Sequence, residues 1–130
     1  MYQILVMDYD ECFFAKVYSD GEIEEVFHEK SLVPHKHRKG GQSAARFAGT
    51  RDVEITHWFK KIDRLLQGIT EEFYLGISSV YSKRLLDTLS TYNQAKIKEI
   101  HSTEYTDLCG IYQFVSKLEG KNFKNNQASC

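Results

Sequence analysis

Apolar residues follow two different periods along this chain. Residues 2–8 form a short, nearly continuous apolar run, which is typical of a strand buried on both faces. Further strands are predicted over residues 12–18 and 22–29, joined by the hairpin turn Asp20-Gly21. The N-terminal part of the chain therefore predicts an antiparallel meander of three strands.

From residue 43 to about residue 67 the period becomes helical. Apolar residues recur there every three or four positions and include Trp58 and Phe59, which we expect in the core. The implied helix has about seven turns, and Gly68 stands where a glycine would cap its C-terminus. Because the apolar stripe begins late, we expect the C-terminal half of this helix to be anchored and its N-terminal end to point outwards.

Strands and helices alternate over the rest of the chain. The pattern predicts, in order, a strand over 72–77, a helix over 80–91, a strand over 96–101 and a helix over 105–118. The inner face of the last helix is expected to hold Leu108, Ile111, Tyr112 and Val115. Such alternation favours parallel pairing beside the meander. We predict an α/β fold with a mixed sheet and three helices over residues 1–118, followed by a polar tail or linker over 119–130.

Length and composition favour one globular domain. The chain has 130 residues, of which 42% are hydrophobic, and no apolar run is long enough to cross a membrane. Its N-terminus lacks the basic region and the small-residue cleavage site of a signal peptide. These features predict a cytoplasmic protein without a membrane partner.

Three cysteines, Cys12, Cys109 and Cys130, are widely separated in the sequence. None belongs to a C-x-x-C pair, which would indicate a zinc site or a redox motif. Free thiols in a reducing compartment are therefore expected.

Positive charge is concentrated in residues 30–51. The formal net charge of the whole chain is only -1. A cationic segment without acids favours a polyanion partner, because each phosphate that it neutralises releases a counterion. Six of the 17 Lys and Arg residues lie in this segment, with no Asp or Glu among them: Lys30, Lys36, Arg38, Lys39, Arg46 and Arg51.

Backbone chemistry within the same segment favours a projecting loop. Pro34 cannot donate to a strand ladder, and Gly40 and Gly41 admit positive φ and a close approach of the backbone to a ligand. Gln42 follows, and Ser43 is a good N-cap for the next helix. A glycine-rich turn that leads into a helix start gathers unpaired N–H groups, which suit a phosphate or an oxyanion.

Two other groups of residues have metal-ligand chemistry. Asp8 and Asp10 follow an apolar strand, as do the carboxylates of some metal-dependent nucleases, but Asp also favours turns for local backbone reasons. His35 and His37 have no Cys or acidic partner nearby, so we interpret them as imidazoles that face RNA. We expect no metal and no cofactor, and a nuclease that uses Asp8 and Asp10 stays as an alternative.

The run HKHRKGGQSAARFAGTR, residues 35–51, resembles the signature of the central domain of eukaryotic and archaeal class I peptide chain release factors. The similarity covers the basic loop, Gly-Gly-Gln, the cap and the helix start, and extends more loosely over residues 2–118. Two positions depart from the family pattern: Arg38 stands where glycine is frequent, and Gly49 stands where a basic residue is usual. Both departures concern affinity for tRNA rather than the tripeptide.

The resemblance implies a ribonuclease-H-like translational architecture and a catalytic role for Gly40, Gly41 and Gln42. These residues would hydrolyse the peptidyl-tRNA ester in concert with the ribosome, by positioning water and stabilising the transition state. It further implies methylation of the Gln42 amide by a glutamine methyltransferase, and a translational GTPase recruited through domains that this chain lacks. The RNA contacts, with large-subunit RNA and the P-site peptidyl-tRNA, would come from Lys36, His37, Arg38, Lys39, Arg46 and Arg51.

Three interpretations remain open from the sequence. The chain is a domain of a termination factor or a compact factor that rescues stalled ribosomes. Alternatively, it is a non-catalytic module that binds RNA or the ribosome and uses Gly40 and Gly41 only as a turn. The metal-dependent nuclease with Asp8 and Asp10 is the third interpretation.

Overall fold

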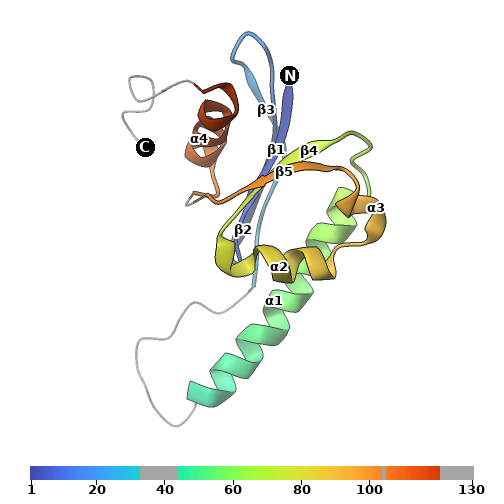
Figure 1. Ribbon diagram of the computed structural model, residues 1–130. Coiled ribbons are helices and arrows are strands. Elements are labelled where there is room, and N and C mark those ends of the chain that lie inside the picture. The colour runs from blue at the N-terminus through green and yellow to red at the C-terminus, as the bar shows by residue number, and fades with distance from the viewer. Residues whose placement is uncertain (33–43, 104, 121–130) are drawn as a thin grey trace.

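The computed structural model describes residues 1–32, 44–103 and 105–120, with the backbone alone for residues 44–51. In this part of the chain, five strands form one sheet in the order β3-β2-β1-β4-β5, with helices on both of its faces (Figure 1). The strands are β1 (Tyr2–Met7), β2 (Glu11–Val17), β3 (Ile23–Lys30), β4 (Phe73–Ile77) and β5 (Ile97–His101). The helices are α1 (Ala44–Leu66), α2 (Ser79–Thr88), α3 (Thr91–Gln94) and α4 (Leu108–Glu119).

Strand β1 lies at the centre of the sheet and joins its two halves. It pairs antiparallel with β2, with Met7 opposite Cys12, and parallel with β4, with Leu5 opposite Leu75. β2 pairs antiparallel with β3, and β4 pairs parallel with β5. The α/β fold with a meander and parallel strands is therefore confirmed. The apolar run of β1 is buried on both faces, as the sequence predicts.

The two faces of the sheet have separate apolar cores. One face packs against α1 and α2 through residues such as Leu5, Phe14 and Phe59. The other face packs against α4 through residues such as Val6 and Phe114. Trp58 and Phe59 are both buried, as expected. No helix within the described ranges is long and apolar enough to cross a membrane.

The predicted helix over 80–91 is divided in two, so the described chain has four helices rather than the predicted three. α2 ends at Leu89, whose backbone is extended and whose side chain is buried. Ser90 then begins α3, and its hydroxyl accepts a hydrogen bond from the Asn93 N–H at 3.3 Å. The break lets Leu89 enter the core and gives the second helix its own N-cap.

The last helix begins at Leu108, three residues later than predicted, because the Asp107 side chain caps it by accepting from the Cys109 N–H at 3.0 Å. Leu108 is exposed, which corrects its expected place on the inner face. Ile111 and Val115 are buried as expected, together with Phe114.

The cysteines differ from the expectation of free thiols. Cys12 is a buried free thiol, and its burial raises its pKa to about 12. Cys109 is disulfide-bonded, so the expectation is wrong for this residue. Cys130 lies outside the described residues.

Candidate functional site

Most of the sequence-predicted site residues lie in residues 33–43, outside the described part of the chain. Arg46 and Arg51 belong to α1, where only the backbone is described. The catalytic and RNA-binding roles predicted for these residues therefore stay predictions. The residues that lie outside the described ranges are Lys36, His37, Arg38, Lys39, Gly40, Gly41 and Gln42.

The described residues do show what holds the two ends of this segment. β3 ends at Lys30, and the Ser31 N–H then donates to the Asp10 carbonyl at 2.8 Å. α1 begins at Ala44, and its first turns extend beyond the sheet (Figure 1). Residues 33–43 therefore connect the end of β3, an edge strand of the sheet, to the outward end of a long helix. The anchoring of α1 determines where that end of the helix points.

One side of α1 is anchored in the core. Ile55, Trp58, Phe59 and Ile62 recur at helical spacing and are all buried. The Trp58 indole Nε1 also donates to the Asp8 carbonyl at 2.9 Å. This bond joins α1 to the turn between β1 and β2 and satisfies a donor that would otherwise be buried without a partner.

A second side of α1 is held by polar groups of α2 and α3. The Arg84 Nη1 donates to Asp52 Oδ1 at 2.7 Å, and its Nη2 donates to the Asp52 carbonyl at 2.6 Å and to Thr56 Oγ1 at 2.7 Å. Further along the helix, Asp63 Oδ1 accepts from the Ser90 N–H at 2.9 Å and from the Asn93 amide at 2.7 Å. These bonds set the direction of α1 relative to α2.

The carboxyl group of Asp63 reflects this environment. Its partial burial alone would raise its pKa, but the hydrogen bonds from Ser90 and Asn93 and the charge of Lys96 outweigh burial, so the pKa is lowered. Asp63 is therefore charged throughout the neutral range.

Lys96 caps the C-terminus of α1, a role that the sequence assigned to Gly68. Its ammonium group donates to the carbonyls of Leu66, at 2.7 Å, and of Ile69. Gly68 does not have a positive φ, and its N–H closes a short turn to the Leu65 carbonyl at 3.3 Å. Burial lowers the pKa of Lys96, and the charge of Asp63 opposes that shift. A cation at this point satisfies orphan carbonyls and complements the helix dipole.

The third side of α1 faces the end of β3 and is basic. Lys61 Nζ lies 3.1 Å from Glu29 Oε1, which joins α1 to β3. Between the two elements lies an open hollow of about 260 Å³, which we call the β3–α1 hollow. Its lining residues are Lys30, Ser31, Leu32, Glu54, His57, Trp58, Lys61 and Arg64.

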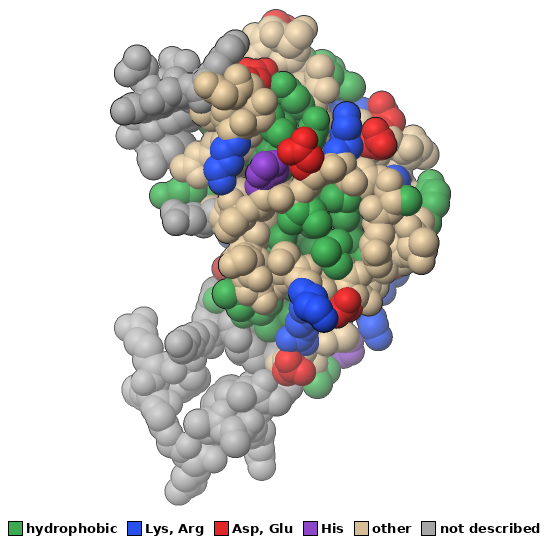
Figure 2. Space-filling view, viewed as in Figure 1, with side chains coloured by type: hydrophobic (Ala, Val, Ile, Leu, Met, Phe, Trp, Pro, Cys, Tyr) green, Lys and Arg blue, Asp and Glu red, His purple; other side chains and the backbone are tan. Residues whose placement is uncertain are grey.

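Other parts of the surface are acidic. Residues 1–32 contain eight Asp and Glu, with Lys16 and Lys30 as their bases. A second open hollow, of about 390 Å³, lies between β2, β3 and the α1–β4 connection, and Glu24, Glu25 and Glu71 are among its lining residues. Figure 2 shows Lys and Arg side chains next to Asp and Glu side chains over α1 and α2 on the face in view. The basic segment 30–51 that the sequence predicts lies mostly outside the described side chains, so its contrast with the rest of the surface stays a prediction.

The carboxylates of the alternative nuclease lie in the turn between β1 and β2. The Asp8 N–H donates to the Glu11 carbonyl at 2.9 Å, and the Asp8 side chain accepts from the Tyr9 N–H at 3.0 Å. Across the described ranges, no group of three or more His, Cys, Asp or Glu side chains is placed to hold a metal ion. The hydrogen bonds of Asp8 within this turn explain an aspartate at this position without a metal ion.

Sequence reasoning missed Arg84, Lys96 and the basic side of α1. The partners of Arg84 and Lys96 lie about thirty residues away in the chain, so no local pattern indicates them. A signal for the basic side was present: His57, Lys61 and Arg64 follow one another at intervals of four and three residues, which places them on one side of a helix.

Comparisons with known proteins define the class to which this fold belongs. A solved structure described as an archaeal protein superposes with a TM-score of 0.65 at 12% identity, covering 91% of this chain and 33% of that chain. At this identity the likeness concerns the fold alone, an α/β domain within a longer protein.

Sequence relatives are more specific. The chain is 29% identical over 126 residues to a protein of Picrophilus torridus named peptide chain release factor subunit 1, covering 90% of this chain and 30% of the relative. It is likewise 29% identical over 138 residues to a protein of Archaeoglobus fulgidus with the same name, covering 92% and 31%. The chain thus spans about 30% of the length of these relatives.

The family model described as eRF1 domain 2 matches residues 1–124. This match covers almost the whole sequence of 130 residues. The chain therefore belongs to the eRF1 domain 2 family.

Proposed function

We propose that this chain ends translation, or releases stalled ribosomes, by promoting hydrolysis of the ester that joins a nascent peptide to tRNA. The observation that carries the proposal is Gly40-Gly41-Gln42 within a basic segment that leads into α1, in a member of the eRF1 domain 2 family. The names of the archaeal relatives, peptide chain release factor subunit 1, support the same activity.

The chemistry requires little of the protein beyond position. The ester is already activated, so the reaction needs a placed water and a donor for the developing oxyanion or the leaving oxygen. In our proposal the Gln42 N–H is that donor, and Gly40 and Gly41 allow the backbone conformation that aims it. An aimed donor of this kind contributes about 10² to 10³ in rate. The Gln42 side-chain amide both donates and accepts, which suits the positioning of a neutral water.

Basic residues would supply the contacts that orient the domain on RNA. Lys36, His37, Arg38, Lys39, Arg46 and Arg51 would meet the phosphates of the acceptor stem and of large-subunit RNA. Phosphate contacts of this kind fix register and orientation without reading sequence. The ribosome is the partner in this proposal.

Further partners depend on the rest of the protein. Because the chain spans about 30% of its relatives, a translational GTPase would act through domains beyond residues 1–118, with residues 119–130 as the linker. A glutamine methyltransferase would modify the Gln42 amide.

The anchoring of α1 gives the proposal its mechanical basis. Core packing by Trp58 and Phe59 and the bonds of Arg84 hold two sides of the helix, and Lys96 caps its C-terminus. A rigid helix loses less entropy when its N-terminal end docks on the ribosome than a mobile one would. This arrangement suits a domain that presents a short catalytic segment at the end of a helix.

Release of a labelled peptide from ribosomes with P-site peptidyl-tRNA tests the proposal. Gln42→Ala keeps all the charges of the basic segment, so it separates catalysis from RNA binding. We expect binding to be retained and release to fall. Equal release by this variant would overturn the role of the Gln42 side chain, and equal release by Gly41→Ala as well would overturn the catalytic role and favour the RNA-binding module. The same assay is repeated on ribosomes without a stop codon in the A site. Release there indicates rescue of stalled ribosomes, and no release indicates codon-dependent termination.

A further inference from the structure

The β3–α1 hollow has a distinctive electrostatic composition. Lys30 is exposed at the end of β3, and Arg64 is exposed on α1. Among the described residues, neither side chain has a carboxylate within salt-bridge distance. Glu29 pairs with Lys61 at 3.1 Å, and Glu54, which lies 3.8 Å from His57, is the one carboxylate among the described lining residues. The hollow therefore presents two uncompensated cations.

The shape of the hollow excludes a buried small-molecule site. Its volume of about 260 Å³ is at or below the lower end of the range for pockets that enclose a ligand, about 300 to 1,000 Å³. It is also open to solvent between one strand end and one side of a helix. Such a site fits a chain that passes across it rather than a molecule that is enclosed by it.

The second open hollow provides an internal comparison. It too is open, but Glu24, Glu25 and Glu71 line it, with Lys16 as the cation among its lining residues. A polyanion would be repelled there and attracted to the β3–α1 hollow. Lys30 is moreover the first residue of the basic segment 30–51, so the hollow continues that segment onto the body of the domain.

We propose that the β3–α1 hollow binds the phosphate backbone of RNA, with Lys30 and Arg64 as its two phosphate contacts. The guanidinium of Arg64 offers paired donors that match the geometry of a phosphate, and Lys30 contributes a compact point charge. Lys61 joins the two walls of the hollow through its ion pair with Glu29. The choice of RNA rather than another polyanion rests on the proposed function, and the position rests on the charges of the hollow itself.

This site includes none of the residues proposed to act in catalysis. It would steady the body of the domain on RNA, in addition to the contacts proposed for the basic segment. The contacts of the hollow and those of the basic segment should therefore contribute separately to the salt dependence of binding. Neither group should change the maximal rate of release.

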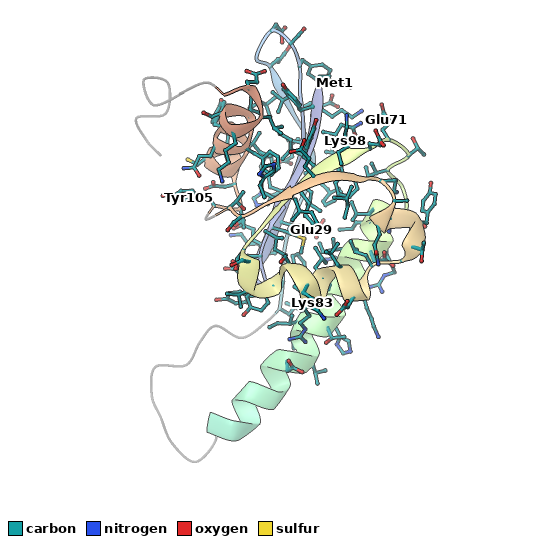
Figure 3. The ribbon with its side chains drawn as sticks, viewed as in Figure 1. Met1, Glu29, Glu71, Lys83, Lys98 and Tyr105 are labelled. Carbon is teal, nitrogen blue, oxygen red and sulfur yellow. The ribbon has the colours of Figure 1, made fainter. Side chains whose placement is uncertain are left out.

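The test measures binding of the chain to a short hairpin of duplex RNA over a range of salt concentrations. The variant Lys30→Gln/Arg64→Gln removes two exposed cations from the hollow. The control Lys83→Gln/Lys98→Gln removes two exposed cations from α2 and β5 (Figure 3), neither of which lines the hollow. Both variants change the net charge equally. A difference in RNA binding between them is therefore caused by the position of the lost charges and not by the net charge of the chain.

We expect the hollow variant to reduce the slope of log K against log salt by about 1.4 to 1.8, which is about 0.7 to 0.9 for each lost phosphate contact. The control should leave the slope within error of that of the parent chain. An unchanged slope in the hollow variant, or an equal reduction in the control, would overturn the proposal. Thermal melting of both variants verifies that the fold is retained.

Two further arms separate the possible failures. Polyglutamate of matched charge tests the ligand class: if it binds as tightly as RNA and depends equally on Lys30 and Arg64, the assignment to RNA is overturned. Peptide release at saturating protein tests the proposed function. A parent chain that binds RNA through the hollow but releases no peptide would overturn the proposed function and leave this inference intact. If the parent chain releases peptide but its RNA binding does not depend on Lys30 and Arg64, the proposed function stands and this inference is overturned.

Discussion

The Arg84 guanidinium of α2 lies 2.7 Å from the Asp52 carboxylate of α1. The contact stands near the point where α1 extends beyond the sheet, and the same guanidinium also reaches the Asp52 carbonyl and the Thr56 hydroxyl. α2 therefore supports the outer part of the helix that leads to the candidate catalytic segment. The core residues closest to this point begin at Ile55, so Arg84 is the outermost described support on this side.

Replacement of Arg84 should loosen the N-terminal part of α1 more than the rest of the domain. In Arg84→Met we expect faster amide hydrogen exchange over residues 44–56 and a loss of about 1 to 2 kcal/mol in the free energy of unfolding. Arg84→Lys should recover part of the effect, because lysine offers a charge but not the paired donors. Hydrogen exchange at Phe59 and Ile62 is the internal control, and equal acceleration there would contradict a local role.

The C-terminus of α1 provides a test of its cap. Lys96→Met removes the donor to the carbonyls of Leu66 and Ile69, and we expect a loss of about 1 to 3 kcal/mol in unfolding free energy. Gly68→Ala should be nearly neutral, because Gly68 lacks a positive φ and an added Cβ would meet only the Leu65 carbonyl oxygen, at 3.7 Å.

If denaturant titrations instead show a large loss of stability for Gly68→Ala and a small loss for Lys96→Met, they would support Gly68 as the cap, as the sequence predicts. A left-handed glycine would lose about 1 kcal/mol on replacement by alanine, while an exposed lysine would lose little. The pair of variants therefore decides between the two accounts.

Asp63 should make stability depend on acid pH. Its pKa in the folded state is lowered, so below the pKa of the unfolded chain the unfolded state binds more protons than the folded state. The stabilisation is fully present above about pH 4 and is lost as pH falls through the folded pKa. In Asp63→Asn, which keeps the acceptor oxygen, we expect lower stability than the parent at neutral pH and the same stability in strong acid. A constant difference across that range in thermal melts would contradict the assignment.

Gly76 in β4 should not tolerate a side chain. A Cβ at this position would lie 2.6 Å from Thr103 Cγ2 and 3.0 Å from Phe114 Cδ2. We expect Gly76→Ala to cost about 1 to 3 kcal/mol through overpacking. The second variant Gly76→Ala/Thr103→Ser removes the closest methyl group and should recover part of the loss. No recovery in urea unfolding would place the strain elsewhere.

Much of the fold was readable because its signals are local. The run of β1, the Asp20-Gly21 turn and the apolar stripe around Trp58 each lie within a few neighbouring residues, and all three predictions are confirmed. The division between α2 and α3 was not readable. It depends on the contact of Ser90 with Asp63, a residue 27 positions earlier in the chain.

The candidate site shows the same limit. The motif Gly40-Gly41-Gln42 is a local signal, and the sequence supplies it directly. The residues that support α1 are not local, since Arg84 meets Asp52 and Lys96 meets Leu66 only after the chain has folded back. The basic side of α1 could have been found from the helical spacing of His57, Lys61 and Arg64, but its partner strand could not.

The most direct test of the account compares peptide release by this protein and by its Gly41→Ala variant, with binding to the same ribosomal complexes measured in parallel. We predict that the variant binds within about twofold of the parent but releases peptide about 10² times more slowly or worse, because the Gln42 N–H is no longer aimed. Release at the parental rate by a variant that binds normally would contradict the account.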